Sequence, residues 1–291
     1  MLAWRSLIPT RRWLQVRLRT ALLLATALCV YLAWPHISRQ YTFWRLCRYA
    51  DRDFADLWIV GESIWSIHPR SSDTETIEEL TKRHLGLEDA LFVNMYPCRP
   101  WAIRRLNSGS ARLMIVLVRQ VMMIPAQDDV RIVLLDGIGR IIADKTIHTG
   151  NRFCVTDVTY EPAGHGFPCV RVDCDVVLQP GLRKQQWIAI RQDRIAEVRI
   201  IRSGLEHGRW IPNYHQLGPN HRFSSHAAWS QALSSSDDID VLEALLDLPP
   251  REAIEKRDAA DIARLTELCR SPDPWIIEGA TAALAEFAPP N

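Results

Sequence analysis

The chain has 291 residues, of which 47% are hydrophobic and 24% are charged, so it can bury the core of one large domain or two smaller ones. Its 35 lysines and arginines nearly equal its 34 aspartates and glutamates, which leaves a formal net charge of +1. This balance removes the usual electrostatic argument for a nucleic-acid partner.

An uncharged apolar segment follows a basic start. Residues 20–38 read TALLLATALCVYLAWPHIS and contain no Lys, Arg, Asp or Glu. A helix of this length spans about 28 Å, close to the roughly 30 Å of a bilayer's hydrocarbon core. Tyr31 and Trp34 near one end are typical of an aromatic belt, and Pro35 suits a helix end. We therefore expect residues 20–38 to form a single transmembrane helix in the lipid bilayer.

The alternative to an anchor is a cleaved signal peptide, which also has a basic start and an apolar stretch. No small-x-small site follows the apolar run, and Leu28 before Cys29 does not fit a lipoprotein-type cleavage site. An uncleaved anchor is therefore favoured. The arginines before the segment slightly outnumber those just after it, where Asp51 and Asp53 also lie. This predicts a cytoplasmic basic tail at residues 1–19 and an exported body, attached to the cell membrane by a single pass.

Residues 39–110 are interpreted as a juxtamembrane α/β segment that joins the body without a Gly/Ser-rich or Pro-rich spacer. Within it, Ser72 and Glu75 have the spacing of a capping box, Ile77 and Leu80 follow at helical spacing, and Gly86 supplies a stop. The pattern predicts a helix from about residue 73 to residue 85.

Residues 111–202 alternate β-branched runs with turn residues, which predicts an antiparallel β-meander or sandwich domain. The turns are expected at Asp136–Gly139 and at Gln192-Asp193. The expected strands are Arg112–Ile124, Val130–Leu135, Arg140–Ile147, Phe153–Tyr160, Pro168–Leu178, Gln186–Arg191 and Arg194–Arg202.

One hairpin in this domain suggests a disulfide. If the chain reverses around Gly164, Val158 and Thr156 face one apolar side of the sheet and Cys154 lies opposite Cys174. In an exported domain, cysteines paired across neighbouring strands could form a disulfide. The alternative is that both are small buried hydrophobic residues. The chain has no CxxC motif, so a zinc or thioredoxin-type site is disfavoured.

A loop is expected over residues 203–224, and four histidines lie in or just after it. Imidazoles are common ligands of zinc and copper, so these residues are the candidates for a metal site: His207, His215, His221 and His226. No pair has the i, i+4 spacing on an expected helix, and no glutamate accompanies them as in HExxH. Histidines scattered along a loop are therefore favoured.

No other motif indicates chemistry. The sequence lacks a GxSxG elbow, a P-loop, a GxGxxG loop and an EF-hand loop. Asp237, Asp238 and Asp240 could be metal carboxylates, but helix capping explains them more simply. The sequence therefore predicts no catalytic residue and no cofactor.

Residues 225–291 are expected to be helical, with helices at Ser225–Leu233, Asp237–Leu246, about 252–270 and after Pro272-Asp-Pro. Leu265 and Leu268, a Ser-Pro-Asp-Pro turn, and the small residues Ala280 and Ala283 make residues 238–288 resemble a HEAT-type repeat. The resemblance implies a stacked helical hairpin that often binds proteins. Because barely two units are present, a packed helical cap is the alternative.

The β segment and the loop after it are similar to parts of uncharacterised membrane-anchored bacterial proteins, which implies no activity. Together these patterns predict an α+β fold with one transmembrane helix, an antiparallel β domain and a HEAT-like helical tail. The favoured function is a non-enzymatic, membrane-anchored envelope protein that contacts a protein partner through its C-terminal helices and binds no nucleic acid. The alternative is an exported enzyme or metal-binding domain that uses the histidine-bearing segment 203–226.

Overall fold

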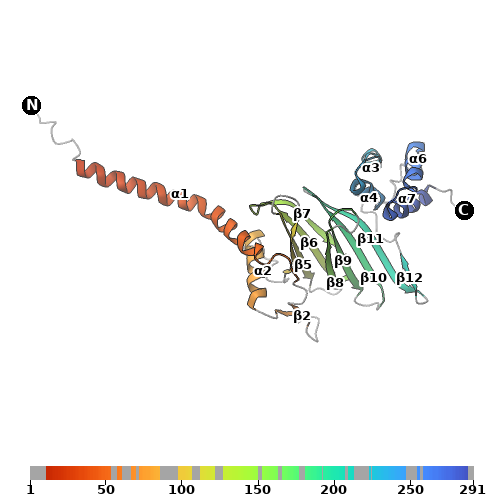
Figure 1. The fold of residues 1–291 in the computed structure, drawn as a ribbon, viewed down its shortest axis with the longest axis horizontal. Coiled ribbons are helices and arrows are strands. Elements are labelled where there is room, and N and C mark those ends of the chain that lie inside the picture. The colour runs from red at the N-terminus through yellow and green to blue at the C-terminus, as the bar shows by residue number, and fades with distance from the viewer. Residues whose placement is uncertain are drawn as a thin grey trace, which may run out of the picture.

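The computed structural model describes residues 11–53, 58–60, 67–69, 72–85, 98–106, 112–121, 127–149, 153–162, 166–176, 181–191, 193–206, 209–212, 223, 225–246, 254–255 and 258–287. They form an α+β fold (Figure 1). The helices are α1 (Arg11–Cys47), α2 (Ser72–Leu85), α3 (His226–Leu233), α4 (Asp238–Leu246), α6 (Ala259–Leu268) and α7 (Pro274–Glu286). The strands are β1 (Arg52–Asp53), β2 (Trp58–Val60), β3 (Ile67–Pro69), β4 (Cys98–Leu106), β5 (Arg112–Val121), β6 (Gln127–Leu135), β7 (Ile141–His148), β8 (Phe153–Glu161), β9 (Cys169–Val176), β10 (Arg183–Ile190), β11 (Ile195–Glu206) and β12 (Arg209–Pro212).

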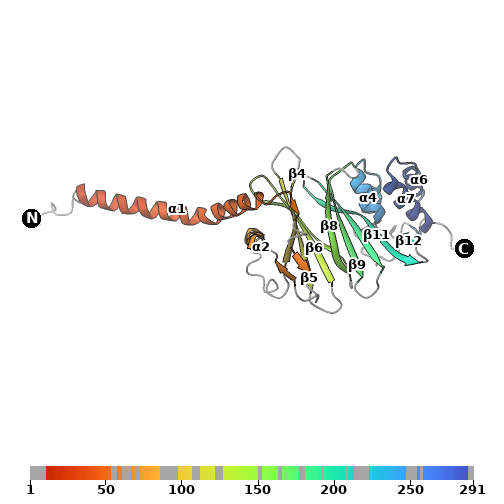
Figure 2. The same cartoon turned by 60° about the horizontal axis from the view of Figure 1, so that its bottom comes forward.

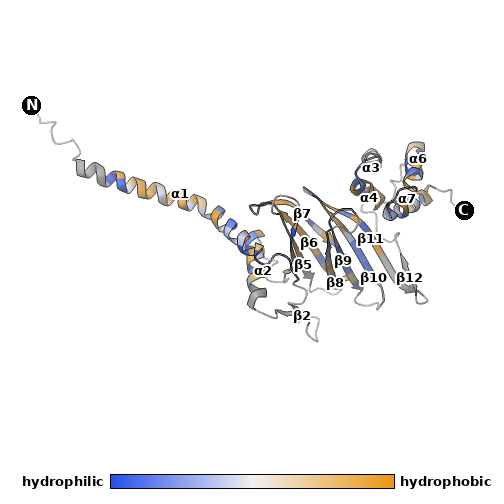
Figure 3. Ribbon diagram, in the orientation of Figure 1, coloured by the Kyte–Doolittle hydropathy of each residue, from blue (hydrophilic) through white to orange (hydrophobic). Residues whose placement is uncertain are grey.

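The apolar segment lies within α1, which is long and apolar enough to cross a membrane. Figure 3 shows this hydrophobic stretch standing clear of the rest of the protein. The prediction that Pro35 ends the helix is wrong, because α1 continues through it to Cys47. Proline removes one backbone hydrogen bond, which apolar helices tolerate, and Phe43 and Leu46 hold the following turns by packing into the body.

The β region forms two antiparallel sheets of five strands each within the described residues, with a separate β2–β3 pair. The first sheet has the order β1-β4-β5-β6-β7 and the second has the order β12-β11-β10-β9-β8. Each of the seven predicted strands is present, with ends that differ by a few residues. Strand β4 was not predicted, and it lies inside the segment interpreted as juxtamembrane.

The two sheets pack face to face around one apolar core that contains residues of both, such as Val116 and Ile132 from the first and Val172 and Ile188 from the second. The outer face of the first sheet is covered by the end of α1 and by α2. The outer face of the second sheet is covered by the C-terminal helices. The body therefore has four layers, helix, sheet, sheet and helix, with the two helical layers at opposite sides (Figure 2).

The predicted register of the β8–β9 hairpin is wrong in two respects. Next to the turn, Val158 pairs with Val172 and not with Val170, and a bulge lies between Val155 and Asp157. Val158 pairs with Val172 and Val155 pairs with Cys174, and these four side chains join the core between the sheets. Cys154 instead lies across from Asp175, so it does not face Cys174, and both cysteines are thiols. The extra bulge residue shifts the pairing by one, which reverses the side of the sheet on which each later residue lies.

The predicted loop after the second sheet begins later than expected. Strand β11 continues to Glu206 and pairs with β12, so the first part of segment 203–224 is a β-hairpin. Residues 213–222 lie outside the described part of the chain. The helix expected from about residue 252 is also corrected, because Asp258 caps the N-terminus of α6 and that helix begins at Ala259.

Candidate functional site

Among the four candidate histidines, only His226 lies in the described part of the chain; His207, His215 and His221 fall outside it. His226 is the first residue of α3, and its Nε2 atom lies 2.5 Å from Oδ2 of Asp261 on α6. The Ser230 hydroxyl donates to the other oxygen of Asp261 at 2.6 Å. The carboxyl group is only 3% exposed, so these two contacts satisfy a buried acid.

The same cluster has the composition of a metal site. Ligand atoms of His226, Asp258 and Asp261 all lie within 4.8 Å of one another. Asp258 is already an acceptor for the backbone N–H of Ala260, as the cap of α6. His226 and Ser230 bind different oxygens of Asp261, so the hydroxyl is not aligned with the imidazole as a nucleophile is with its base. The arrangement joins α3 to α6 and can supply one nitrogen and two carboxylates to a cation.

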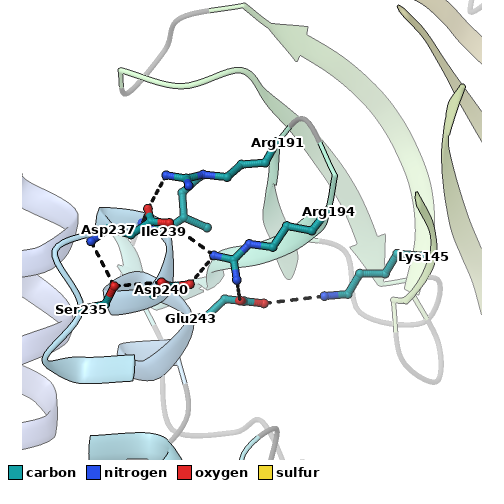
Figure 4. Close-up of polar contacts among 8 residues, drawn as sticks. All are labelled: Lys145, Arg191, Arg194, Ser235, Asp237, Ile239, Asp240 and Glu243. Carbon is teal, nitrogen blue, oxygen red and sulfur yellow. Dashed lines mark hydrogen bonds and ion pairs between the residues drawn. The ribbon is translucent and has the colours of Figure 1, made fainter. Parts of the chain in front are cut away.

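A charged cluster joins the turn between β10 and β11 to α4 (Figure 4). Arg191 forms an ion pair with Asp237, and Arg194 forms one with Asp240. Arg194 also lies 3.8 Å from Glu243, which in turn lies 3.8 Å from Lys145 on β7. The cluster therefore connects α4 with both sheets. Asp237 also accepts the backbone N–H of Ile239, so capping accounts for it as predicted.

Ion pairing within this cluster shifts the pKa values of Asp240 and Arg194. Burial by itself raises the pKa of Asp240, but the hydrogen bonds from Arg194 and Ser235 outweigh burial and lower that pKa below its ordinary value. Burial likewise acts to lower the pKa of Arg194, while Asp240, Glu243 and Asp237 raise it. Both groups are therefore ionised at neutral pH and contribute an attractive contact between sheet and helix.

We expect a double-mutant cycle of Arg194→Ala and Asp240→Asn to give a coupling energy of about 1 kcal/mol in urea unfolding, because the pair is partly shielded from water. The matched control is Arg183 with Asp175, whose side chains are 61% and 48% exposed. That pair should show coupling close to zero. Equal coupling for the two pairs would mean that the Arg194 contact adds no more to stability than an exposed surface pair.

Aromatic contacts fasten the last helix to the second sheet. Trp187 on β10 and Trp275 on α7 meet edge to face with ring centroids 5.0 Å apart. The guanidinium of Arg199 lies 4.9 Å from the Trp275 ring centroid and donates to Glu278 at 2.6 Å. Burial lowers the pKa of Arg199, and the charge of Glu278 opposes that shift. The C-terminal helices are therefore bound to the sheet by apolar, aromatic and ionic contacts together.

A third contact region lies where α1 meets the body. Phe43 packs so closely on the turn between β6 and β7 that a Cβ atom at Gly139 would lie 2.6 Å from its Cγ. His84 at the end of α2 is hydrogen-bonded through Nε2 to the Gly139 carbonyl at 2.8 Å, and its ring centroid lies 5.9 Å from that of Phe43. The ends of α1 and α2 thus meet on this turn, and we call this arrangement the anchor junction.

We expect His84 to make stability depend on pH. Burial lowers its pKa below the ordinary value, and the charge of Arg39 adds to the shift, while the Gly139 carbonyl opposes it. As the pH is lowered, the unfolded chain therefore takes up a proton on His84 before the folded protein does. The contribution of His84 to the free energy of unfolding is complete above about pH 6.5, and it is lost as the pH falls from there toward the pKa of His84 in the folded state.

The measurement is the urea midpoint of the detergent-solubilised chain between pH 5 and pH 8. His84→Gln should flatten the loss of stability below about pH 6.5. His148→Gln is the comparison variant, because the His148 side chain is 71% exposed and its Nδ1 atom lies 3.1 Å from Oδ1 of Asp129, so this change affects a surface pair and not a buried imidazole. An unaltered profile in His84→Gln would show that this buried imidazole does not titrate between the folded and unfolded states.

A buried lysine lies where the chain crosses from the first sheet to the second. Lys184 on β10 is 2% exposed, and its Nζ atom donates to the Thr149 carbonyl at 2.6 Å. The ammonium also lies 5.4 Å from the ring centroid of Phe153. Sequence reasoning missed this residue because the strand was expected to begin only at Gln186, and because a lysine is ordinarily placed in contact with solvent. Its contacts fasten the crossover between the sheets.

The buried thiol of Cys169 has little nucleophilic character. Burial, with a further contribution from Glu161, raises the pKa of Cys169 to about 12. A thiol with that pKa stays protonated at neutral pH and is a poor nucleophile and metal ligand. Cys174 is buried in the core between the sheets. These two side chains pack as small hydrophobic residues, which was the alternative reading for Cys174.

Comparison with known proteins found no matching family model, no matching curated protein and no matching solved structure. The resemblance of residues 238–288 to HEAT-type repeats therefore stays a prediction. The described residues support the hairpin of α6 and α7. Asp273, which belongs to the Ser-Pro-Asp-Pro turn, is the N-cap of α7.

Proposed function

We propose that this protein is a single-pass envelope protein that holds a helical protein-binding tail at a fixed distance from the membrane. In this proposal α1 crosses the bilayer with its N-terminus in the cytoplasm, and the four-layer body is exported. The function is structural, through contacts with a protein partner, and needs no cofactor.

The observation that carries the proposal is the continuity of α1. One helix includes the apolar segment and then buries Phe43 and Leu46 in the outer core of the first sheet, at 7% and 0% exposure. A removable leader is normally joined to the mature domain by a segment that can be cut. Here the segment after the apolar stretch is a structural part of the body, which favours an uncleaved anchor.

The tail is the surface best placed for a partner. The anchor and the C-terminal helices lie at opposite sides of the body (Figure 1). The charged cluster at Arg194 and the aromatic contact of Trp187 with Trp275 hold the tail to the second sheet. A binding surface fixed in this way loses little conformational freedom when a partner docks.

The anchor and its orientation are tested in cells. The full-length protein should resist carbonate extraction, and a C-terminal fusion should be active with a periplasm-active reporter and inactive with a cytoplasm-active one. Protein that carbonate releases, or a mature chain that begins after Trp34, would refute the anchor. Activity of only the cytoplasmic reporter would reverse the orientation and leave the anchor standing.

The partner is tested by photo-cross-linking in intact cells. A benzophenone amino acid in place of Ile277, which is 36% exposed on α7, should give a discrete protein adduct. Leu182 is the control, because it is equally exposed, at 37%, but lies before β10 and away from the tail. The same adducts at both positions, or none at Ile277, would argue against a protein-binding tail.

A second candidate function, metal binding, is favoured by the cluster of His226, Asp258 and Asp261. One imidazole and two carboxylates within reach of one another match the ligands of zinc. If this site binds metal, Zn²⁺ should raise the melting temperature of the purified chain, and His226→Ala or Asp258→Asn should remove that rise. No rise in the wild-type protein would leave the cluster as a contact between α3 and α6.

A further inference from the structure

The exposed apolar side chains of the body gather at the anchor junction. Beyond the apolar segment toward the C-terminus, the described part of the chain has six large hydrophobic residues that are clearly exposed: Tyr41, Trp44, Ile138, Ile141, Leu182 and Ile277. The first four belong to the end of α1 and to the turn that leads into β7. We call Tyr41, Trp44, Ile138 and Ile141 the junction patch.

Two contacts place both parts of the junction patch at the same end of the body. Phe43, between Tyr41 and Trp44 on α1, packs on Gly139, which directly follows Ile138 in the turn. Ile141 pairs with Leu135, whose side chain lies in the core under α1 and α2. The turn therefore lies on the side of the body from which α1 leaves (Figure 1).

The height of the patch along α1 matches the headgroup layer of a bilayer. Phe43 lies five residues beyond Ser38, where the apolar segment ends, which is about 7.5 Å along a helix. The headgroup region adds about 5–7 Å to each side of the hydrocarbon core, and a tilt of α1 toward the side of the turn brings the turn closer to it. The patch is therefore at the level where a phospholipid surface meets water.

The chemistry of the patch fits the same layer. Tyr41 and Trp44 are near neighbours, with ring centroids 6.1 Å apart, and the guanidinium of Arg48 lies 3.8 Å from the Trp44 centroid. Aromatic rings of this amphipathic kind are enriched at membrane interfaces. Arg39 and Arg140 are exposed beside the patch, and arginine binds phosphate oxygens in a bidentate manner.

The acidic side chain at the start of the turn, Asp136, already accepts hydrogen bonds from the turn itself. Oδ1 of Asp136 accepts the backbone N–H groups of Ile138 and Arg140, at 2.9 and 2.8 Å. These bonds close the turn around its own carboxylate. The carboxylate is therefore held within the turn by backbone donors, and the exposed side chains beside it, Ile138 and Arg140, are apolar or cationic.

We propose that the body rests on the phospholipid surface through the junction patch, with Ile138 and Ile141 inserted among the headgroups as a second membrane contact beside α1. This inference rests on the proposed anchor. The contact fixes the angle between the body and the membrane, because one crossing helix leaves the body free to rotate and a second contact removes that freedom. The C-terminal helices are then held away from the bilayer in one orientation.

The test is photo-cross-linking of the full-length protein in vesicles of phosphatidylethanolamine and phosphatidylglycerol. A benzophenone amino acid in place of Ile138 should form a phospholipid adduct at least roughly tenfold more often than the same group in place of Ile277, because only the first lies among headgroups. Both positions are exposed, at 43% and 36%, so neither replacement disturbs a core.

Resistance to carbonate extraction is measured on the same samples. It distinguishes a failure of the proposed anchor from a failure of the proposed lipid contact alone. Protein that carbonate removes would refute the anchor and this inference together. Protein that resists carbonate but gives equal lipid adducts at Ile138 and Ile277 would overturn the inference and leave the anchor intact. As a second variant, Ile138→Asp in a chain labelled in place of Ile141 should reduce the lipid adduct, because a carboxylate is repelled by the anionic headgroup layer.

Discussion

Replacing Gly139 with alanine is expected to lower the free energy of unfolding by about 3 kcal/mol, because two penalties combine at this position. The residue has φ +83°, a left-handed conformation that side chains disfavour. A new Cβ would also lie 2.6–2.9 Å from three atoms of Phe43, so α1 or the turn must move. A loss of this size lowers the melting temperature by roughly 6–12 °C in a body of this length.

The chain contains a matched control for Gly139→Ala. Gly166 has nearly the same backbone conformation, with φ +79°, but nothing lies within 4 Å of its would-be Cβ. Gly166→Ala should therefore show the backbone strain alone, about 1 kcal/mol. The difference between the two variants isolates the contact between α1 and the turn. Equal losses would mean that this contact is loose and that α1 is not tightly fixed to the body.

Replacing Trp229 with alanine is expected to destabilise the body by about 4 kcal/mol, the largest effect of any substitution proposed here. Trp229 on α3 is fully buried, and its Nε1 atom donates to the Ala244 carbonyl on α4 at 2.9 Å. The change removes buried apolar area, leaves a cavity and takes away the hydrogen-bond partner of a buried carbonyl. Trp229→Phe keeps most of the volume and should cost about 1–2 kcal/mol.

For Trp229→Ala, the number of transitions in urea unfolding is as informative as the midpoint of unfolding. The core around Trp229 includes Ala189, Ala196 and Val198 of the second sheet, so helices and sheet share one apolar cluster. We therefore expect circular dichroism and tryptophan fluorescence to report a single transition at a lower urea concentration. Separate melting of the helices, with the sheets unchanged, would show that the tail folds as an independent unit, as a stacked solenoid does.

These two substitutions act on opposite outer layers of one body. Gly139 lies under the end of α1, and Trp229 lies in the layer of C-terminal helices. Between them, the two sheets share a single core. A force applied to the tail would therefore reach the anchor through packed side chains, since close-packed cores transmit strain.

Local patterns predicted most of the elements. The helix expected from about residue 73 to residue 85 is present as α2, and the β-branched runs between residues 111 and 202 are strands. The turn at Asp136–Gly139 is also present, because the aspartate closes it through its own carboxylate. These features depend on hydrogen bonds and steric preferences within a few residues, so the sequence carries them directly.

The errors arose where distant contacts decide the structure. Pro35 does not end α1, because Phe43 and Leu46 pack on a sheet formed much later in the chain. Cys154 does not face Cys174, because the pairing next to the turn is offset from the predicted one and a bulge at Val155 then brings that valine into the core in place of the cysteine. Neither contact leaves a periodic signal in the sequence.

By itself, the sequence determined one helix long and apolar enough to cross a membrane, the α+β composition and the approximate strand positions, because each follows from the hydropathy and turn chemistry of neighbouring residues. The tertiary structure alone determined that His226 meets Asp261, that Arg194 meets α4 and that Gly139 meets Phe43 at the end of α1. Each of these meetings joins elements far apart in the chain, and only the packing of two sheets between two helical layers brings them together.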